Sequence, residues 1–242
     1  MPSILALENI SKRFSAIVIA DGIDLALEQG EALGIIGPNG AGKTTLFGIM
    51  TGTVEPDAGR VMFEGRDLTR LTPARRCALG IARSFQIPQP FGGMTVFENL
   101  VVAAAFGGGH AEGRVYAASF EILERCGLGE KANRLAGSLT LIDRKRLELA
   151  RALATSPKVL LLDEVAGGLT EHECAALVEL IKDIRREGIS IIWIEHIVHA
   201  LLAVVDRLVV LHGGAIIAQG EPHSVIRTPA VAEIYLGIEA DA

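Results

Sequence analysis

The residues whose types and spacing could do chemistry begin with a glycine-rich run, Gly37–Thr45, which reads Gly-Pro-Asn-Gly-Ala-Gly-Lys-Thr-Thr. It fits the pattern G-x-x-x-x-G-K-[ST] at every fixed position. An apolar segment precedes it (32–36), and a stretch that reads as a helix follows it (46–50). Glycines let the backbone wrap around phosphate oxygens, and the start of a helix adds the positive end of its dipole. The run therefore predicts a phosphate-binding loop between a strand and a helix.

Within this loop, we expect Lys43 to reach the β- and γ-phosphates of a nucleotide and the Thr44 hydroxyl to hold Mg²⁺. The expected nucleotide contacts are Gly37, Asn39, Gly40, Ala41, Gly42, Lys43, Thr44 and Thr45. The competing interpretation is a plain glycine-rich turn, which leaves the lysine and threonine unexplained. The loop therefore predicts ATP and Mg²⁺ as cofactors.

An acidic pair, Asp163-Glu164, directly follows the apolar run Val159–Leu162. A continuous apolar run is typical of a parallel strand buried on both faces. An acid at the carboxyl end of such a strand can hold Mg²⁺ through water, so we assign that role to Asp163. Glu164 can then act as general base on the attacking water. The alternative is two solvated acids at a strand end.

Three further side chains are candidates for the same site. Gln86 ends one predicted strand (81–85) and could touch Mg²⁺ or the attacking water, although an ordinary loop glutamine is the alternative. His196 follows another predicted strand (189–194) and could contact the γ-phosphate, although a histidine there can also be structural. Phe14 could stack on adenine or could be a core aromatic.

The elements that must position these groups predict an α/β fold. Apolar or alternating stretches near the N-terminus, such as Ile4–Leu7 and Ile23–Leu27, read as strands of an antiparallel β subdomain. Strand patterns are nearly absent between Thr95 and Ala154, where three helices are expected over 95–106, 114–125 and 142–154. Thr95 and Thr170 each begin a capping box. Thr72 is expected to cap a short helix that begins at Pro73.

Composition limits the function classes. The chain has 242 residues and a net charge of −6, which argues against nucleic acid as the main partner. It contains no apolar run of about 18 residues, so no membrane span is expected. No secretory signal is recognisable at the N-terminus. The three cysteines are far apart and predict reduced thiols in a cytosolic core.

Taken together, these motifs resemble the ATP-binding subunit of an ABC transporter, in order and spacing, over nearly the whole chain. The stretch Asp163–Thr170 and the tail around Tyr235–Gly237 are similar to the branched-chain amino-acid importer type. The resemblance implies a P-loop NTPase core of the ABC ATPase type. Its expected parts are 1–94 (first part of the core), 95–154 (an inserted helical subdomain), 155–220 (second part of the core) and 221–242 (a helical tail).

The resemblance also implies partners and a location. Two ATPase domains would pair head to tail, with each phosphate loop facing the other chain's signature motif. Transmembrane permease subunits would hold the chain peripherally at the cytoplasmic face of the inner (plasma) membrane. The implied function is ATP hydrolysis that powers import of a branched-chain amino acid or similar small solute. The alternatives are a soluble ABC-type ATPase outside transport and a nucleotide-binding module with little hydrolysis.

One stretch departs from the family pattern. Where the family has Leu-Ser-Gly-Gly-Gln, this chain has Leu139-Thr140-Leu141-Ile142-Asp143. Both glycines are missing, so side chains should crowd the place where backbone N–H groups approach a γ-phosphate. We also expect Asp143 to add a repulsive negative charge there. The departure predicts a heterodimer with a second ATPase subunit of regular signature, with a homodimer as the alternative.

Overall fold

Two β-sheets form the body of the computed structural model, which describes residues 3–108 and 112–236. In the described residues, the smaller sheet has four strands in the order β2-β1-β4-β5, and every neighbouring pair is antiparallel. Its strands are β1 (Ser3–Phe14), β2 (Ile17–Glu28), β4 (Ala58–Phe63) and β5 (Arg66–Asp67). This is the antiparallel β subdomain that the N-terminal strand patterns predict.

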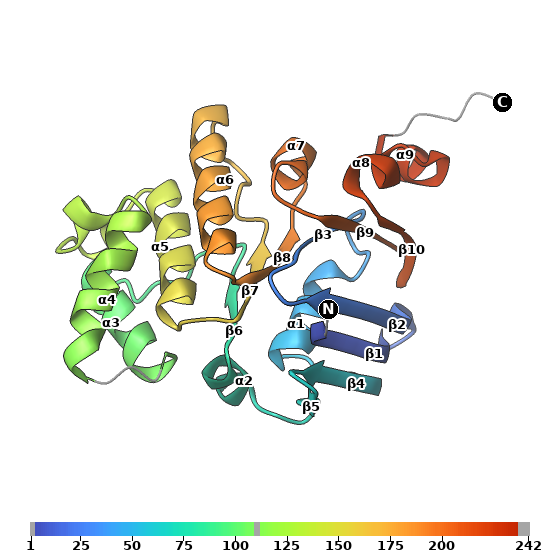
Figure 1. Cartoon of the computed structure of the whole chain (residues 1–242), viewed down its shortest axis with the longest axis horizontal. Helices are drawn as coiled ribbons and strands as arrows, with labels where there is room; N and C mark the ends of the chain where they lie inside the picture. Colours follow the sequence, from blue (N-terminus) through green and yellow to red (C-terminus); the bar gives the residue numbers. More distant parts are fainter. Residues whose placement is uncertain (1–2, 109–111, 237–242) are drawn as a thin grey trace.

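The larger sheet carries the candidate site. Its order is β10-β9-β3-β8-β7-β6, and all neighbours are parallel except the hairpin pair β9 and β10. Its strands are β3 (Ala32–Ile36), β6 (Ile81–Ser84), β7 (Val159–Asp163), β8 (Ser190–Ile194), β9 (Arg207–His212) and β10 (Ala215–Gly220). Every residue of β3, β7 and β8 is buried, as continuous apolar runs predict. Since β3, β8, β7 and β6 are parallel neighbours, their carboxyl ends meet at one edge (Figure 1).

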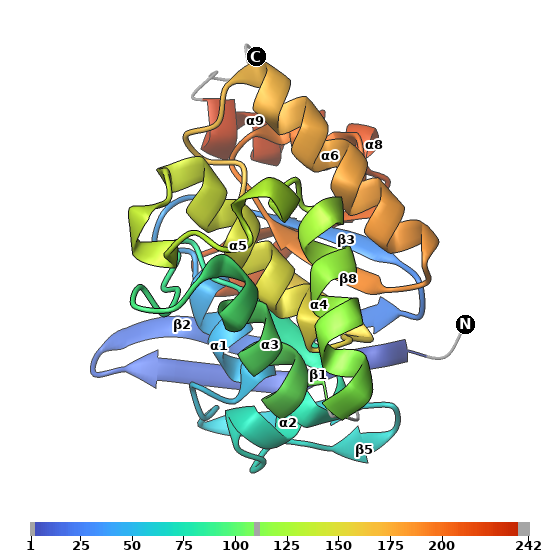
Figure 2. The ribbon, with the colours of Figure 1, turned by 90° about the vertical axis from the view of Figure 1, so that its left-hand side faces the viewer.

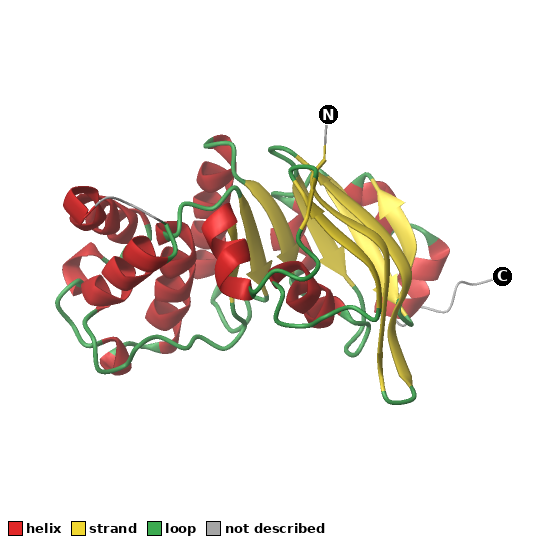
Figure 3. Ribbon diagram, turned by 90° about the horizontal axis from the view of Figure 1, so that it is seen from below, coloured by secondary structure: helices red, strands yellow, loops and turns green. Residues whose placement is uncertain are grey.

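Two apolar cores cover the two faces of this sheet. One joins it to the antiparallel sheet through α1 (Lys43–Thr51), whose buried side chains include Leu46, Phe47 and Ile49. The other lies against the remaining helices. The helices of the core and tail are α2 (Pro73–Leu79), α6 (Glu171–Arg186), α7 (Val198–Leu202), α8 (Pro222–Ile226) and α9 (Pro229–Leu236). Figure 3 shows the strands gathered at one end of the molecule and a cluster of helices at the other.

That cluster is the helical subdomain, formed by α3 (Val96–Phe106), α4 (Glu112–Arg125) and α5 (Leu141–Ala154). Its helices lie side by side in Figures 1 and 2. The predicted starts of α4 and α5 were late by two residues and one residue, respectively. The capping box at Thr95 is present: its hydroxyl accepts from the N–H of Glu98 at 3.1 Å, and the Glu98 carboxylate accepts from the N–H of Thr95 at 2.7 Å. Thr170 forms the same box with Glu173 at the start of α6.

A buried arginine ties α2 to α1. Arg76 is 1% exposed, and its guanidinium donates to the carbonyls of Ile49 and Met50 in the last turn of α1, and to those of Thr69 and Leu71. These bonds satisfy carbonyls that a helix end leaves without intrahelical partners. The helix that begins at the phosphate loop is therefore fixed at its far end.

Two smaller expectations have different outcomes. Thr72 takes the N-cap position of α2 and Pro73 the first helical position, as predicted, although the Thr72 side chain makes no capping hydrogen bond. The tail does form helices α8 and α9, while residues 237–242, including the last residue of the Tyr235–Gly237 match, lie outside the described part. In residues 3–108 and 112–236, no helix combines the length and apolar character needed to cross a membrane.

Candidate nucleotide-binding site

The predicted phosphate loop connects the end of β3 to the start of α1. Gly42 immediately precedes α1 with a φ of 96°, and a Cβ there would lie 2.5 Å from the carbonyl oxygen of Ile19. A side chain at Gly37 would come within 2.3 Å of the carbonyl oxygen of Leu211. No side chain caps the start of α1, so its first N–H groups are available to an anion. Glycine is therefore required at both positions, because a side chain there would clash with a neighbouring carbonyl oxygen.

A cavity of about 540 Å³ opens above this loop. It brings together most of the side chains expected to act on a nucleotide, although they come from distant parts of the sequence. The cavity is lined by Ile19, Asn39, Gly40, Ala41, Gly42, Lys43, Thr44, Thr45, Gln86, Glu164 and His196.

Lys43 is held inside its own loop. Its Nζ donates to the carbonyl oxygens of Gly37 at 2.7 Å and Pro38 at 3.0 Å, and the residue is 6% exposed. Burial lowers the pKa of Lys43, while the carboxylates of Glu164 and Asp163 act in the opposite direction. The lysine is therefore fixed close to the place where phosphate oxygens would lie.

The residues present fit a magnesium ion. Thr44, Gln86 and Asp163 line a second cavity of about 410 Å³ beside the first. The Asp163 side chain is 1% exposed; its Oδ2 accepts from Nη2 of Arg83 at 2.6 Å, and its buried Oδ1 has no hydrogen-bond partner among the described residues. Burial raises the pKa of Asp163, and the Arg83 guanidinium opposes that shift. A buried, unpaired carboxylate oxygen beside a threonine hydroxyl is the donor set that a hard cation takes.

Glu164 lies between the other two candidate catalytic side chains. Its Oε1 is 3.0 Å from Nε2 of His196, and its Oε2 accepts from the side-chain amide of Gln86. The backbone of Glu164 has a φ of 48°, which is strained for a residue with a side chain. A strained backbone at this position is typical of functional sites, where the surrounding structure maintains it.

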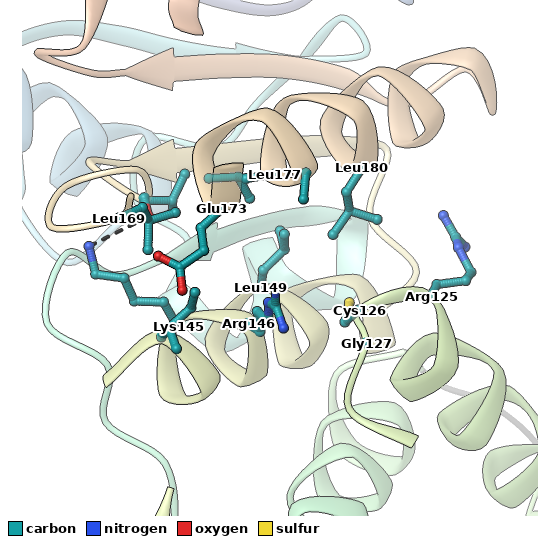
Figure 4. Close-up of a pocket in the computed structure, with 13 residues that line it drawn as sticks. Arg125, Cys126, Gly127, Lys145, Arg146, Leu149, Leu169, Glu173, Leu177 and Leu180 are labelled. Carbon is teal, nitrogen blue, oxygen red and sulfur yellow. Dashed lines mark hydrogen bonds between the residues drawn. The ribbon is translucent and has the colours of Figure 1, made fainter. Parts of the chain in front are cut away.

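The turn after Glu164 is held from two sides. Lys145 in α5 donates through Nζ to the carbonyl of Gly167 and lies 3.5 Å from the carbonyl oxygens of Glu164 and Val165. The buried carboxylate of Glu195 accepts from the N–H of Ala166 at 2.9 Å. Figure 4 shows Lys145 at one end of a cavity of about 190 Å³ between α5 and α6. Lys145 therefore joins the turn after Glu164 to α5 of the helical subdomain.

Comparison with known proteins identifies the family. Residues 20–167 match the sequence pattern of the family described as ABC transporter. The chain belongs to the ABC transporter family.

Relatives and solved structures agree with this membership. The chain is 36% identical over 250 residues to the probable branched-chain amino acid transport ATP-binding protein LivG of Methanocaldococcus jannaschii, with 97% of each protein covered. It is 36% identical to the high-affinity LivG protein of Salmonella typhimurium, covering 97% of this chain and 98% of that one. A crystal structure of a nucleotide-free ATP-binding cassette from an ABC transporter superposes with a TM-score of 0.88 at 34% identity, covering 98% and 100% of the two chains. An ADP-bound cassette gives a TM-score of 0.87 at 35% identity, covering 98% of this chain and 100% of that one. The fold is therefore that of an ABC ATPase cassette.

The unusual signature segment corrects one expectation about this ABC cassette. Asp143 does not present a free negative charge, because Nζ of Lys131 lies 2.7 Å from each of its carboxylate oxygens. The Thr140 hydroxyl donates to the same carboxylate at 2.9 Å and accepts from the N–H of Asp143, which caps α5. Leu141 is 62% exposed at the helix start. The segment therefore offers a neutral, capped helix end with an apolar side chain where the family pattern has glycine.

Phe14, like Gly37, is an expected nucleotide contact that does not line the cavity. It is 49% exposed near the turn between β1 and β2, with Nζ of Lys12 at 5.3 Å from its ring centre. Its stacking on adenine stays a prediction. Ile19 lines the cavity instead, and no motif in the sequence marks it.

The sequence patterns also did not single out Arg83, which contacts Asp163. It is the one charged residue of the strand predicted over 81–85, where a charge that is buried needs a partner. That anomaly was the signal that could have found it.

Proposed function

We propose that this chain is the ATP-hydrolysing subunit of an ABC importer for a branched-chain amino acid or a similar small solute. One observation carries the proposal: the phosphate-loop cavity contains Lys43, Glu164, Gln86 and His196 together. The names of the relatives, which are branched-chain amino acid transport ATP-binding proteins, support the solute class.

In the proposed reaction, the N–H groups of the phosphate loop and Lys43 bind the β- and γ-phosphates. Thr44, Gln86 and Asp163 would hold Mg²⁺, which supplies charge neutralisation on the phosphate oxygens. Glu164 takes a proton from the attacking water as the new oxygen–phosphorus bond forms and the bond to ADP breaks. Gln86 and His196 orient its carboxylate through the contacts described above. The products are ADP and inorganic phosphate.

The permease partner has a suitable groove on this chain. A cavity of about 400 Å³ between the core and the helical subdomain includes three exposed aromatic side chains, those of Phe85, Phe91 and Phe106. Exposed apolar patches of this kind mark protein interaction sites. We assign this groove to a transmembrane permease subunit, which would hold the chain peripherally at the cytoplasmic face of the inner membrane.

A second ATPase subunit is the other proposed partner. In a head-to-tail dimer, the partner's nucleotide would meet the Leu139–Asp143 segment of this chain. The exposed Leu141 stands there in place of glycine, so this second site would be weak. A partner with a regular signature would still give one complete site, formed by this chain's phosphate loop and the partner's signature. The same exposed leucine favours a second candidate function, a nucleotide-binding subunit that hydrolyses ATP only slowly when it acts alone.

The test compares Lys43→Ala with Lys182→Ala, a control that removes a partly exposed lysine of α6 that pairs with Glu179 and does not line the cavity. Loss of the charge-assisted contacts of Lys43 should weaken ATP binding by roughly 10- to 100-fold. Calorimetry with ATP and Mg²⁺ measures the affinity for ATP. An equal affinity in both variants would refute the assignment of the phosphate loop as the nucleotide site. Co-purification with a multi-spanning membrane protein tests the transport role against a soluble ATPase.

A further inference from the structure

The strongest unexplained feature near the site is the buried ion pair between Arg83 and Asp163. The Nη2 atom of Arg83 lies 2.6 Å from Oδ2 of Asp163, and the two side chains are 9% and 1% exposed. The residues are 80 positions apart and lie on the neighbouring strands β6 and β7. None of the sequence motifs described above includes this arginine.

The guanidinium is fixed by more than its carboxylate partner. It lies 5.5 Å from the ring centre of Phe47 in α1 and 4.9 Å from that of Phe85, just after β6. Contacts of this kind attract an arginine to the faces of aromatic rings. Since Phe47 is fully buried in the core, Arg83 has a defined position relative to α1 and therefore to Thr44.

We propose that Arg83 is a positioning residue for metal-dependent nucleotide binding, which holds Oδ2 of Asp163 so that Oδ1 faces Mg²⁺. The inference rests on the proposed function, because it assumes that Asp163 serves the metal. The division of roles between the two oxygens supports it: Oδ2 has its partner in Arg83, and Oδ1 is the buried atom without one. Partners behind a metal-binding carboxylate fix its orientation and strongly affect metal affinity.

The pair also has a physical reason to act on the metal rather than only on stability. A buried carboxylate without a cation is costly, so without Arg83 the carboxylate would turn toward another donor. Such a turn would change the direction of Oδ1 while leaving the phosphate loop and Lys43 in place.

The experiment measures how much Mg²⁺ strengthens nucleotide binding in the full chain. Arg83→Met removes the charge and keeps the length of the side chain, whereas Arg83→Lys keeps the charge and loses the planar fork. Arg207→Met is the matched control, because Arg207 is also partly buried and pairs with Glu31 at 2.7 Å, and it lines neither cavity of the candidate site. Calorimetry gives the affinity for ATP in EDTA and in Mg²⁺, and Mn²⁺ spin resonance reports metal binding without turnover.

In EDTA, all variants should bind ATP as the unmodified chain does. The gain in affinity on adding Mg²⁺ should fall about 10-fold in Arg83→Met, which is the lower end of the effect of losing a residue that supports a metal ligand. In Arg83→Lys the gain should fall about 3-fold. The control Arg207→Met should keep the full gain. A folded Arg83→Met that keeps the full gain overturns the inference; if that variant does not fold, a full gain in Arg83→Lys overturns it. Failure of the proposed function is distinguishable, because the unmodified chain itself would then show no gain with Mg²⁺.

Discussion

The ion pair between Lys131 and Asp143 predicts a change in the free energy of unfolding whose size follows from the exposure of the two side chains. Lys131→Met removes the ammonium group and leaves the Asp143 carboxylate, which is 5% exposed, with only the Thr140 hydroxyl and its own capping contact. Hydrogen bonds to charged groups contribute about 1.5–3 kcal/mol. Because Lys131 is 32% exposed, the lower end applies. We expect a loss of about 1.5 kcal/mol in the free energy of unfolding, or about 3–6 °C in Tm for a chain of this size.

Two controls separate this pair from a general effect of losing a lysine. Lys158→Met removes an exposed pair with Glu64 and should change the free energy of unfolding by less than about 0.5 kcal/mol. Lys131→Met in an Asp143→Asn background should also cost little, because no buried charge is left alone. Urea denaturation followed by circular dichroism measures all five chains: the unmodified chain, Lys131→Met, Lys158→Met, Asp143→Asn and the double variant. If Lys131→Met unfolds at the same urea concentration as Lys158→Met, the pair does not anchor α5.

The same pair predicts a pH dependence. Burial acts to raise the pKa of Asp143, but the hydrogen bonds from Lys131 and Thr140 and the charge of Lys131 outweigh it and hold the pKa below its usual range. A carboxyl with a lowered pKa in the folded state stabilises the fold above its unfolded pKa, about 4, and stops doing so as the pH falls through the folded value. The stability difference between the unmodified chain and Lys131→Met should therefore be constant from about pH 7 to 5 and shrink below about pH 4.

Three further predictions concern catalysis and reactivity. Glu164→Gln should keep ATP binding, slow phosphate release by about 100-fold or more because the base is gone, and stabilise an ATP-bound dimer on size exclusion; unchanged turnover would show that Glu164 is not the base. Burial raises the pKa of the Cys126 thiol to about 12, so a disulfide reagent at pH 8 should label Cys126 only after urea unfolding, and rapid native labelling would contradict the buried position. Leu141→Gly with Ile142→Gly should raise the hydrolysis rate of the lone chain, whereas fast, cooperative hydrolysis by the unmodified chain would remove the case for a second ATPase.

Local patterns predicted much of this structure, because they depend on residues close in sequence. The capping boxes at Thr95 and Thr170 use contacts between residues three positions apart, and both form. The hairpin of β9 and β10 turns at Gly213 and Gly214, which both have positive φ, so two adjacent glycines meet this requirement locally. The phosphate loop was recognisable because its demands for glycine, lysine and threonine are all met within nine residues.

The rest depends on contacts that no local pattern contains. Arg83 and Asp163 meet only because β6 and β7 are neighbours in the sheet. The charge of Asp143 was misjudged because its partner, Lys131, belongs to a short turn that the helical pattern does not include. Lys145 reaches the turn after Glu164 through the packing of α5, which fixes a distance that sequence spacing does not. The sequence therefore predicted most of the groups that line the candidate site, but not the side chains that hold them in position.

The position of Lys43 has a consequence for the speed of turnover. Because its ammonium already donates to the carbonyls of Gly37 and Pro38, a phosphate that binds there replaces two existing hydrogen bonds instead of filling an unmet need. The loop thus contains an internal competitor for its own ligand, which reduces the net free energy of binding. When the product phosphate leaves, the Lys43 ammonium can donate to the same two carbonyls again, so its hydrogen bonds are restored without a change in the loop. In the proposed ATP complex, release of a phosphate group is therefore an exchange of hydrogen-bond partners for Lys43, from phosphate oxygens to the carbonyls of Gly37 and Pro38.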